Sequence, residues 1–261
     1  MNYKKELDFI KIRIRQACEI YSVSSSLVIS QKAEHDLVTD IDYKIEAFII
    51  NGIREYFPDD SILSEETLST QDILGRTWTV DPIDGTCNMA HGIPIYGVQC
   101  SLIENNEIVA SAIYLSNFDD MYTTTINTGS YRNENRISVS HKSTIENAII
   151  SFGDYSHNNI PLADKQHAAI GNLYKKIAKV RFWGAACFDF SYVADGKTDG
   201  AVVLTNNLWD IAPGILLAKE AGAVITNIYG NPYSFSDEGV VVAANQEISD
   251  LLVSMLTNND T

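Results

Sequence analysis

The apolar residues at the start of the chain follow the period of an amphipathic helix. Leu7, Ile10 and Ile14 recur every three or four positions, so they lie on one face of a helix that covers about the first twenty residues. The next segment, from Val23 to Asp36, is polar and rich in serine, and it predicts a loop or a short extended pair. The chain therefore begins with a helix whose apolar face needs a partner.

A second apolar stripe, between residues 41 and 53, predicts another helix. Thr39 precedes it as a suitable N-cap, because its hydroxyl accepts a hydrogen bond from a free amide of the first turn. Pro58 closes the segment, since proline cannot continue helical hydrogen bonding. We expect the two helices to cover one face of a sheet.

The middle of the chain predicts strands. Short apolar runs rich in β-branched and aromatic residues are separated by turn residues, and Asn105-Asn106 predicts a hairpin turn between two of them. The predicted strands cover residues 62–63, 77–81, 96–102, 108–115, 121–125 and 129–131.

The rest of the chain alternates strands with helices and includes a polar loop at 154–159. Strands are predicted at 147–152, 180–183, 200–204, 224–225 and 240–244, and helices at 162–178, 187–194, 211–221 and 247–256. Pro213 is expected in the first turn of its helix, where a missing amide is tolerated. This order predicts a layered α+β fold with two antiparallel sheets between pairs of helices. No G-x-G-x-x-G follows a strand and no G-K-[ST] occurs, which excludes dinucleotide-binding and P-loop folds.

Charge narrows the choice of partners. The chain has 34 acidic and 19 basic residues, a net charge of −15, which disfavours nucleic acid and anionic membranes. A phosphorylated substrate would be repelled too, so a phosphate site here needs local metal cations. The four cysteines show no C-x-x-C spacing and the N-terminus lacks an apolar signal core, so we expect a cytoplasmic protein without zinc or disulfides.

The stretch W-T-V-D-P-I-D-G-T-C-N-M, which begins at Trp78, places two carboxylates at the end of a predicted strand. We expect the strand to end at Asp81, because Pro82 lacks the amide that would continue the ladder. Asp81 and Asp84 supply hard oxygen ligands suited to Mg²⁺, and the amides that follow can face an anion. Asp-Pro and Asp-Gly are also common turn dipeptides, so the stretch alone leaves a plain turn open.

Acidic residues stand at comparable places elsewhere, next to the ends of strands or the starts of helices. They are Asp42, Glu65 with Glu66, and Asp210. Taken singly, Asp42 and Asp210 can simply favour the positive end of a helix, and Glu65-Glu66 can be a solvated strand end. Together with the two aspartates after Trp78 they supply the carboxylates for two or three Mg²⁺ ions, and a metal pair can clamp the attacking and leaving oxygens of a phosphoryl group.

Five motifs agree in order and spacing with one family. The matches are Asp36–Asp42 to D-L-V-T-x-x-D, Ser64–Glu66 to the acidic pair of G-E-E, Trp78–Asn88 to W-x-[VI]-D-P-[IL]-D-G-T-x-N, Arg181–Ala186 loosely to R-x-x-G-[ST]-A-A, and Trp209–Gly214 to W-D-x-A-x-G. Over nearly its whole length the sequence resembles the inositol monophosphatase family, within the lithium-sensitive Mg²⁺-dependent phosphatase superfamily.

The resemblance implies a single domain over residues 1–261, folded as a layered α/β/α/β/α sandwich and assembled as a homodimer. The N-terminal half, about 1–145, would bind metal, and the C-terminal half, about 146–261, would face the substrate. The reaction implied is hydrolysis of a phosphate monoester by metal-activated water, with inhibition by Li⁺.

The same resemblance assigns metal ligands. Glu65, Asp81 and the carbonyl of Ile83 would hold one Mg²⁺, and Asp81, Asp84 and Asp210 would hold a second. A third, weaker ion would lie near Glu65, mainly through water.

Roles in catalysis and substrate binding follow from the resemblance as well. Thr86, oriented by Asp42, would help to deprotonate the attacking water, and Asp42 and Glu65 would also serve the third ion. The residues expected around the substrate are Gly85 and Thr86 at the phosphate, and Gly184, Ala185 and Asp210 beside it.

We expect a small phosphorylated metabolite as substrate: an inositol-1-phosphate-like polyol or sugar phosphate, fructose-1,6-bisphosphate or NADP. Ser64 replaces the usual glycine before the acidic pair, and the segment Val202–Thr205 has no acid where inositol-specific members carry a glutamate. The second departure argues against inositol phosphate as the preferred substrate. Two alternatives stay open. One is a haloacid-dehalogenase-type phosphatase, although the two aspartates of that class are two residues apart, whereas Asp81 and Asp84 are three apart. The other is a non-catalytic metal-binding scaffold.

Overall fold

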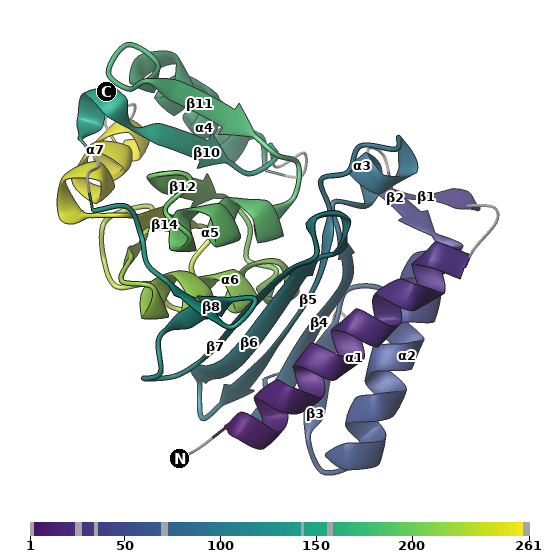
Figure 1. Cartoon of the computed structure of the whole chain (residues 1–261). Coiled ribbons are helices and arrows are strands. Elements are labelled where there is room, and N and C mark those ends of the chain that lie inside the picture. The colour runs from purple at the N-terminus through teal and green to yellow at the C-terminus, as the bar shows by residue number, and fades with distance from the viewer. Residues whose placement is uncertain are drawn as a thin grey trace.

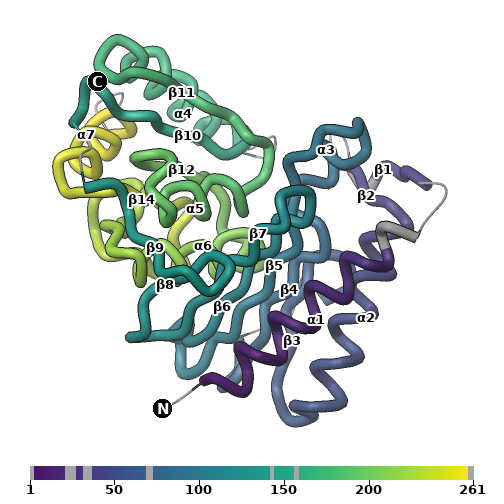
Figure 2. The backbone as a smooth tube through the Cα atoms, in the orientation of Figure 1, coloured from purple at the N-terminus to yellow at the C-terminus, as the bar shows by residue number. Residues whose placement is uncertain are grey.

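Five layers of secondary structure stack in the order helix, sheet, helix, sheet, helix (Figure 1). The computed structural model describes residues 3–23, 28–33, 36–68, 73–141, 144–155 and 159–257. Two helices cover the outer face of a seven-stranded sheet, two lie between that sheet and a five-stranded sheet, and two cover the far side of the latter. The backbone trace in Figure 2 follows the same arrangement. The predicted α+β sandwich is confirmed.

The first layer consists of α1 (Lys4–Val23) and α2 (Asp40–Tyr56). Their apolar stripes, which include Ile14 and Ile49, are buried against the seven-stranded sheet. Thr39 caps α2 as predicted: its hydroxyl accepts the amide of Ile41 at 3.2 Å, and the carboxylate of Asp42 accepts the amide of Thr39 at 2.9 Å. This reciprocal capping box fixes the start of α2.

The segment between these helices contains a short extended pair, one of the two predicted options. Strand β1 (Ile29–Ala33) runs antiparallel to β2 (Asp36–Thr39). Residues 24–27 and 34–35 of the predicted segment lie outside the described residues.

The seven-stranded sheet has the order β3-β4-β5-β6-β7-β8-β9. Its strands are β3 (Ser61–Ser64), β4 (Arg76–Asp84), β5 (Gly97–Glu104), β6 (Glu107–Leu115), β7 (Asp120–Thr125), β8 (Ser130–Arg132) and β9 (Asn135–Ile137). Asn105 and Asn106 form the predicted hairpin turn, with φ of 52° and 64°, the left-handed values of a two-residue hairpin loop. Strand β9 was not among the predicted strands. Three short helices accompany these strands: α3 (Thr86–Ala90) between β4 and β5, η1 (Ser116–Phe118) between β6 and β7, and η2 (Ile145–Asn147) after β9.

The five-stranded sheet has the order β11-β10-β12-β14-β13 and is mixed, so the prediction of two antiparallel sheets is wrong. Its strands are β10 (Ile149–Phe152), β11 (Lys179–Phe182), β12 (Gly200–Val203), β13 (Val224–Asn227) and β14 (Val240–Ala243). Strands β10, β11 and β12 run parallel because a helix connects each to the next, whereas β14 is antiparallel to β12 and β13. In the larger sheet β3 and β4 are parallel too.

Helices α5 (Ala186–Ala194) and α6 (Leu208–Glu220) fill the space between the sheets. They pack closely, since a Cβ on Gly214 would lie 2.2 Å from the ring of Phe190. Helix α6 begins at Leu208, three residues before the prediction, so Pro213 lies inside the helix and not in its first turn.

The last layer consists of α4 (Ile160–Leu173) and α7 (Gln246–Thr257), which lie on the far side of the five-stranded sheet. Helix α4 ends five residues before the predicted residue 178. Residues 156–158 of the predicted polar loop lie outside the described residues. None of the helices formed by the described residues has the length and apolar character needed to cross a bilayer.

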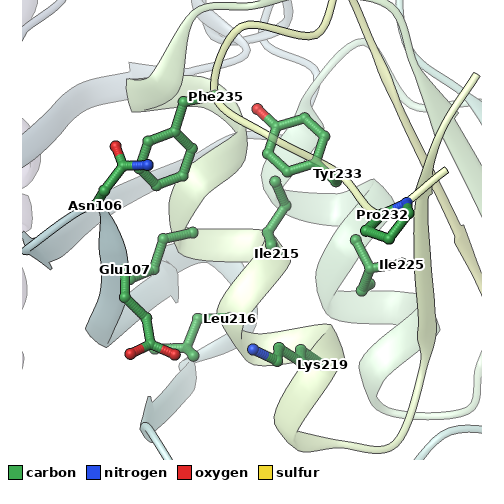
Figure 3. A pocket seen from close by; sticks show the side chains of 10 residues that line it. Asn106, Glu107, Ile215, Leu216, Lys219, Ile225, Pro232, Tyr233 and Phe235 are labelled. Carbon is green, nitrogen blue, oxygen red and sulfur yellow. The ribbon is translucent and has the colours of Figure 1, made fainter.

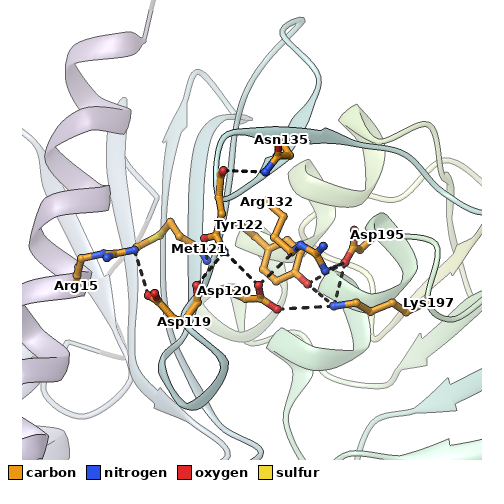
Figure 4. A network of polar contacts seen from close by, with 10 residues as sticks. Arg15, Asp119, Asp120, Met121, Tyr122, Arg132, Asn135, Asp195 and Lys197 are labelled. Atoms are coloured by element: carbon orange, nitrogen blue, oxygen red, sulfur yellow. Dashed lines mark hydrogen bonds and ion pairs between the residues drawn. The ribbon is translucent and has the colours of Figure 1, made fainter.

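A charged network holds the turn after α5 against the large sheet (Figure 4). Asp195 accepts hydrogen bonds from Nη1 of Arg132 on β8 at 2.7 Å and lies 2.9 Å from Nζ of Lys197. Lys197 also donates to the hydroxyl of Tyr122 on β7 at 3.0 Å. The network therefore fixes the middle helices relative to the sheet.

Candidate active site

Strand β4 continues past Asp81 to Asp84, so the predicted strand end is wrong. Asp81 pairs with Gln99 of β5 and Asp84 pairs with Gly97, which leaves β4 with one residue more than β5 in this interval. Side chains alternate along a strand, so residues three apart would face opposite sides, and the extra residue brings both aspartates to the same side. Pro82 lies in this irregular stretch, where no ladder amide is required.

Asp81 is 1% exposed, and none of the described residues donates a hydrogen bond to its Oδ1 atom. Its Oδ2 atom accepts a hydrogen bond from Nε2 of Gln99 at 3.3 Å. Burial, together with the negative charges of Glu65, Asp84 and Asp210, raises the pKa of Asp81 well above its ordinary value. Acids from β4, from the turn after β3 and from α6 therefore act electrostatically on one buried carboxylate.

Asp84 is tied to the first turn of α5. Its Oδ1 atom accepts the amide of Ala186 at 3.1 Å, and its Oδ2 atom accepts the amide of Cys187. Burial raises the pKa of Asp84 to about 6, against the opposing effect of these hydrogen bonds. The free amides at the start of a helix suit an anion, so Asp84 links the large sheet to the middle layer.

Asp210 lies in the first turn of α6 and is half-buried. Its Oδ2 atom accepts a hydrogen bond from Nδ2 of Asn207 at 3.1 Å, and its backbone oxygen accepts one from Nε2 of Gln99, also at 3.1 Å. Gln99 therefore connects Asp81 with Asp210. It was not predicted; the available signal is a glutamine within the apolar run of a central strand.

Thr86 lies against Asp42, as the resemblance implies. The Oγ1 atom of Thr86 is 3.1 Å from Oδ1 of Asp42 and 2.8 Å from the backbone oxygen of Ile83. Asp42 is buried, which raises its pKa against the hydrogen bonds from Thr39 and Thr86. The carboxylate thus caps α2 and contacts the hydroxyl at the start of α3 at the same time.

The two turns predicted to face the substrate lie against each other. Gly85 has a φ of 92°, and a Cβ there would lie 3.0 Å from the Cβ of Ala185. Gly184 also has a positive φ, 67°, and Nδ2 of Asn88 donates to the backbone oxygen of Trp183 at 2.8 Å. The start of α3 and the turn before α5 are therefore neighbours, 100 residues apart in sequence.

Asp189 on α5 is a buried acid that the sequence did not single out. Its side chain is fully buried, and among the described residues neither carboxylate oxygen accepts a hydrogen bond of regular geometry, although the hydroxyl of Ser151 lies nearby. Burial raises its pKa well above the ordinary value, the charges of Asp84 and Asp154 add to this effect, and the hydroxyl of Ser151 opposes it. Asp189 is therefore a further buried acid near Asp84, and its burial favours the protonated form.

The donor set fits a hard divalent cation. Carboxylates are the ligands that Mg²⁺ and Ca²⁺ prefer, and Asp81 presents a buried oxygen that no described residue pairs with. In their present positions, no three Asp, Glu, His or Cys side chains of the described residues form a metal-binding group. Both carboxylate oxygens of Asp84 accept hydrogen bonds from amides of α5. Glu65, Asp84 and Asp210 all act on Asp81 with negative charge, which a bound cation would offset.

A separate pocket of about 430 Å³ lies further along α6 (Figure 3). Its walls are mostly apolar and include Ile215 and Phe235. Lys219 and Glu107 are the charged residues that line it. None of the candidate acids lines it. The pocket and the acidic site are thus distinct features that share one helix.

The comparison with known sequences decides the family. The sequence profile of the inositol monophosphatase family matches residues 10–260. The chain belongs to the inositol monophosphatase family. It is 30% identical over 258 residues to the fructose-1,6-bisphosphatase/inositol-1-monophosphatase of Aquifex aeolicus, which covers 97% of this chain and 96% of that protein.

Solved structures of inositol monophosphatases share the fold. The IMPase of Thermotoga maritima aligns with a TM-score of 0.88 at 27% identity, over 97% of both chains. An IMPase/NADP phosphatase complexed with NADP and Ca²⁺ aligns with a TM-score of 0.87 at 21% identity, over 100% of this chain and 98% of that chain. This member of the inositol monophosphatase family is a phosphoric monoester hydrolase, so the haloacid-dehalogenase and non-catalytic interpretations are set aside.

Proposed function

We propose that this enzyme hydrolyses a small phosphorylated metabolite with two or three Mg²⁺ ions held by Glu65, Asp81, the carbonyl of Ile83, Asp84 and Asp210. The observation that carries the proposal is the burial of Asp81 beside three other acids, with no hydrogen bond to its Oδ1 atom from the part of the chain that the structure describes. A buried carboxylate in such surroundings is unfavourable unless a cation accompanies it.

When bound, Mg²⁺ supplies the Lewis acidity that makes water a nucleophile near neutral pH, and its charge offsets that of the phosphate. Thr86 is positioned to move a proton: its Oγ1 atom can take a proton from the attacking water while its own proton passes to Oδ1 of Asp42, 3.1 Å away. The raised pKa of Asp42 makes it a stronger proton acceptor than an exposed aspartate.

The phosphoryl group is assigned to the start of α3. The amides of Gly85 and Thr86 stand at the start of α3 and can donate to phosphate oxygens. The turn of Gly184 and Ala185, with Asp210, bounds the remainder of the substrate. Binding and orientation of the ester, with charge neutralisation, are the main tasks of such a site.

Three substrate classes are proposed: a polyol or sugar phosphate similar to inositol 1-phosphate, fructose 1,6-bisphosphate, and NADP. The name of the Aquifex aeolicus relative combines the first two, and a protein of the same fold was solved with NADP. Val202, Val203 and Leu204 are buried and apolar, so this segment offers no carboxylate to the hydroxyls of an inositol ring. We therefore place inositol phosphate below the other two.

A phosphate-release assay over these compounds tests the proposal. We expect release from at least one of them with Mg²⁺, loss of release with EDTA, and inhibition by Li⁺. No release from any compound with Mg²⁺, or release that EDTA leaves unchanged, would contradict it.

We also propose a cytoplasmic homodimer that acts without nucleic acid or membrane partners. The edge strand β11 carries Phe182, which is 46% exposed and stacks on the exposed Tyr155 with ring centroids 6.2 Å apart, an apolar surface suited to a second copy. The four cysteines are free, which agrees with a reducing compartment. Light scattering of the purified protein would give the mass of a dimer, and a monomer at micromolar concentration would contradict the assembly.

A further inference from the structure

Glu46 on α2 is a buried carboxylate outside the set of proposed metal ligands. It is 1% exposed, and its Oε1 atom accepts three hydrogen bonds. The donors are the hydroxyl of Ser64, the amide of Glu66 at 2.9 Å and the amide of Thr67 at 3.2 Å. Ser64 ends β3, and Glu66 and Thr67 lie in the turn that follows, so one carboxylate oxygen of α2 holds the end of the strand and the turn.

The three donors surround Glu65 in the sequence. The amide of Glu65 itself donates to the backbone oxygen of Val80 on β4 at 3.3 Å, so its backbone is fixed on both sides, to β4 directly and to α2 through its neighbours. Hydrogen bonds to an ionised carboxylate are shorter and stronger than neutral ones. The arrangement therefore restricts where the side chain of Glu65 can lie.

Ser64 strengthens this contact with its side chain. It is fully buried, and its hydroxyl donates to Glu46. Glycine, which is usual at this position in the inositol monophosphatase family, has no hydroxyl to donate. The departure noted in the sequence thus adds a third hydrogen bond to Glu46.

We infer that Glu46 is a positioning residue: through the backbone of the turn it holds Glu65 beside Asp81, and Ser64 is its partner in this role. The inference rests on the proposed function, because Glu65 matters here as a ligand of the divalent cation. Glu46 touches neither substrate nor cation in this account, and its effect reaches them through Glu65.

A matched control exists on α6. The carboxylate of Glu220 accepts the amides of Asn127 at 2.8 Å and Gly129 at 2.9 Å, so it also holds a turn of the large sheet. That turn carries none of the proposed ligands. Glu220→Gln therefore weakens a comparable contact far from the acidic site.

The test measures Mn²⁺ binding to the full-length protein by electron paramagnetic resonance, without substrate. Glu46→Gln keeps the length of the side chain but removes the charge that strengthens the three hydrogen bonds, and we expect Mn²⁺ to bind roughly tenfold more weakly. Ser64→Ala is expected to weaken binding in the same direction but less. Glu220→Gln is expected to stay within about twofold of the wild type.

Equal Mn²⁺ affinity of Glu46→Gln and the wild type would overturn the inference, as would an equal loss in Glu220→Gln. If Glu46→Gln does not fold, as judged by circular dichroism, Ser64→Ala decides, and wild-type affinity in that variant overturns the inference. Asp81→Asn distinguishes failure of the proposed metal site from failure of the role of Glu46. If it binds Mn²⁺ as the wild type does, the proposed function fails; if it loses Mn²⁺ while Glu46→Gln does not, only the role of Glu46 fails.

Discussion

The carboxylate of Asp84 accepts a hydrogen bond from the amide of Ala186, 102 residues further along the chain, at 3.1 Å. Asp84 ends β4 of the large sheet, and Ala186 begins α5 of the middle layer. One side chain therefore joins the acidic end of the sheet to the turn proposed to bound the substrate. A substitution at Asp84 is therefore expected to shift the start of α5, and a displacement of α5 to shift the carboxylate of Asp84.

Replacement of Asp81 by asparagine is expected to stabilise the cation-free protein. Burial and three neighbouring acids raise the pKa of Asp81, so its ionised form is unfavourable in the folded state, whereas asparagine carries no charge. We expect the free energy of unfolding in EDTA at pH 8 to rise by an amount on the order of 1 kcal/mol. Urea denaturation of both proteins measures this, and a less stable variant would speak against unfavourable charge at this position.

Gly85→Ala is expected to destabilise the fold more than Gly75→Ala. Both glycines have positive φ, 92° and 58°, so alanine pays the cost of left-handed backbone at either position, about 1 kcal/mol. Only at Gly85 would the new Cβ also meet other atoms, 2.9 Å from a backbone oxygen and 3.0 Å from Ala185; nothing lies within 4 Å of it at Gly75. Denaturation midpoints give the difference, and equal losses in the two variants would show that the close approach at Gly85 has no energetic effect.

Thr86→Val and Thr86→Ser separate the hydroxyl from the shape of the side chain. The hydroxyl lies 3.1 Å from Asp42, where it is proposed to move a proton, and general acid–base steps contribute roughly 10²–10⁴-fold to a rate. We expect kcat of Thr86→Val to decrease by a factor in that range and kcat of Thr86→Ser to change little. KM should be similar in both variants. A valine variant with wild-type kcat would remove Thr86 from the proton path.

Stability at high pH is expected to depend on Asp189. Its pKa in the folded state is raised by burial above the ordinary value of about 4, so the folded protein favours the protonated acid. Its contribution to stability is fully present below about pH 4 and is lost as the pH rises through the folded-state pKa. Asp189→Asn does not titrate, so in EDTA its stability relative to the wild type should increase from pH 5 to pH 8. A difference that does not change with pH would contradict this assignment.

Local patterns sufficed for much of the fold. Thr39 caps α2 and Asn105-Asn106 turns the hairpin, because both features depend on residues that are neighbours in sequence. The direction of β10 and β12 was predicted wrongly, since apolar spacing does not report how strands pair. The predicted end of β4 at Asp81 was too early. Pro82 lies in a bulge where the ladder needs no amide, and a bulge depends on the pairing with β5, which the sequence does not report.

The acidic residues of the site were predicted from their motifs, whereas the residues that hold them were not. Gln99 and Glu46 lie inside otherwise apolar segments, where a polar residue has many explanations. Their partners, Asp210 for Gln99 and the turn at Glu66 for Glu46, come from distant parts of the chain. Only the folded structure reveals these contacts.

The central claim is that acids from separate segments hold Mg²⁺ against a phosphoryl group, and the rate of phosphate release as a function of Mg²⁺ concentration tests it most directly. For the wild type we expect release that saturates with Mg²⁺ on a substrate found by the assay described above. For Asp81→Asn, folded as judged by circular dichroism, we expect release near the uncatalysed rate at every Mg²⁺ concentration. Release by Asp81→Asn at the wild-type rate, with the same dependence on Mg²⁺, would contradict the account.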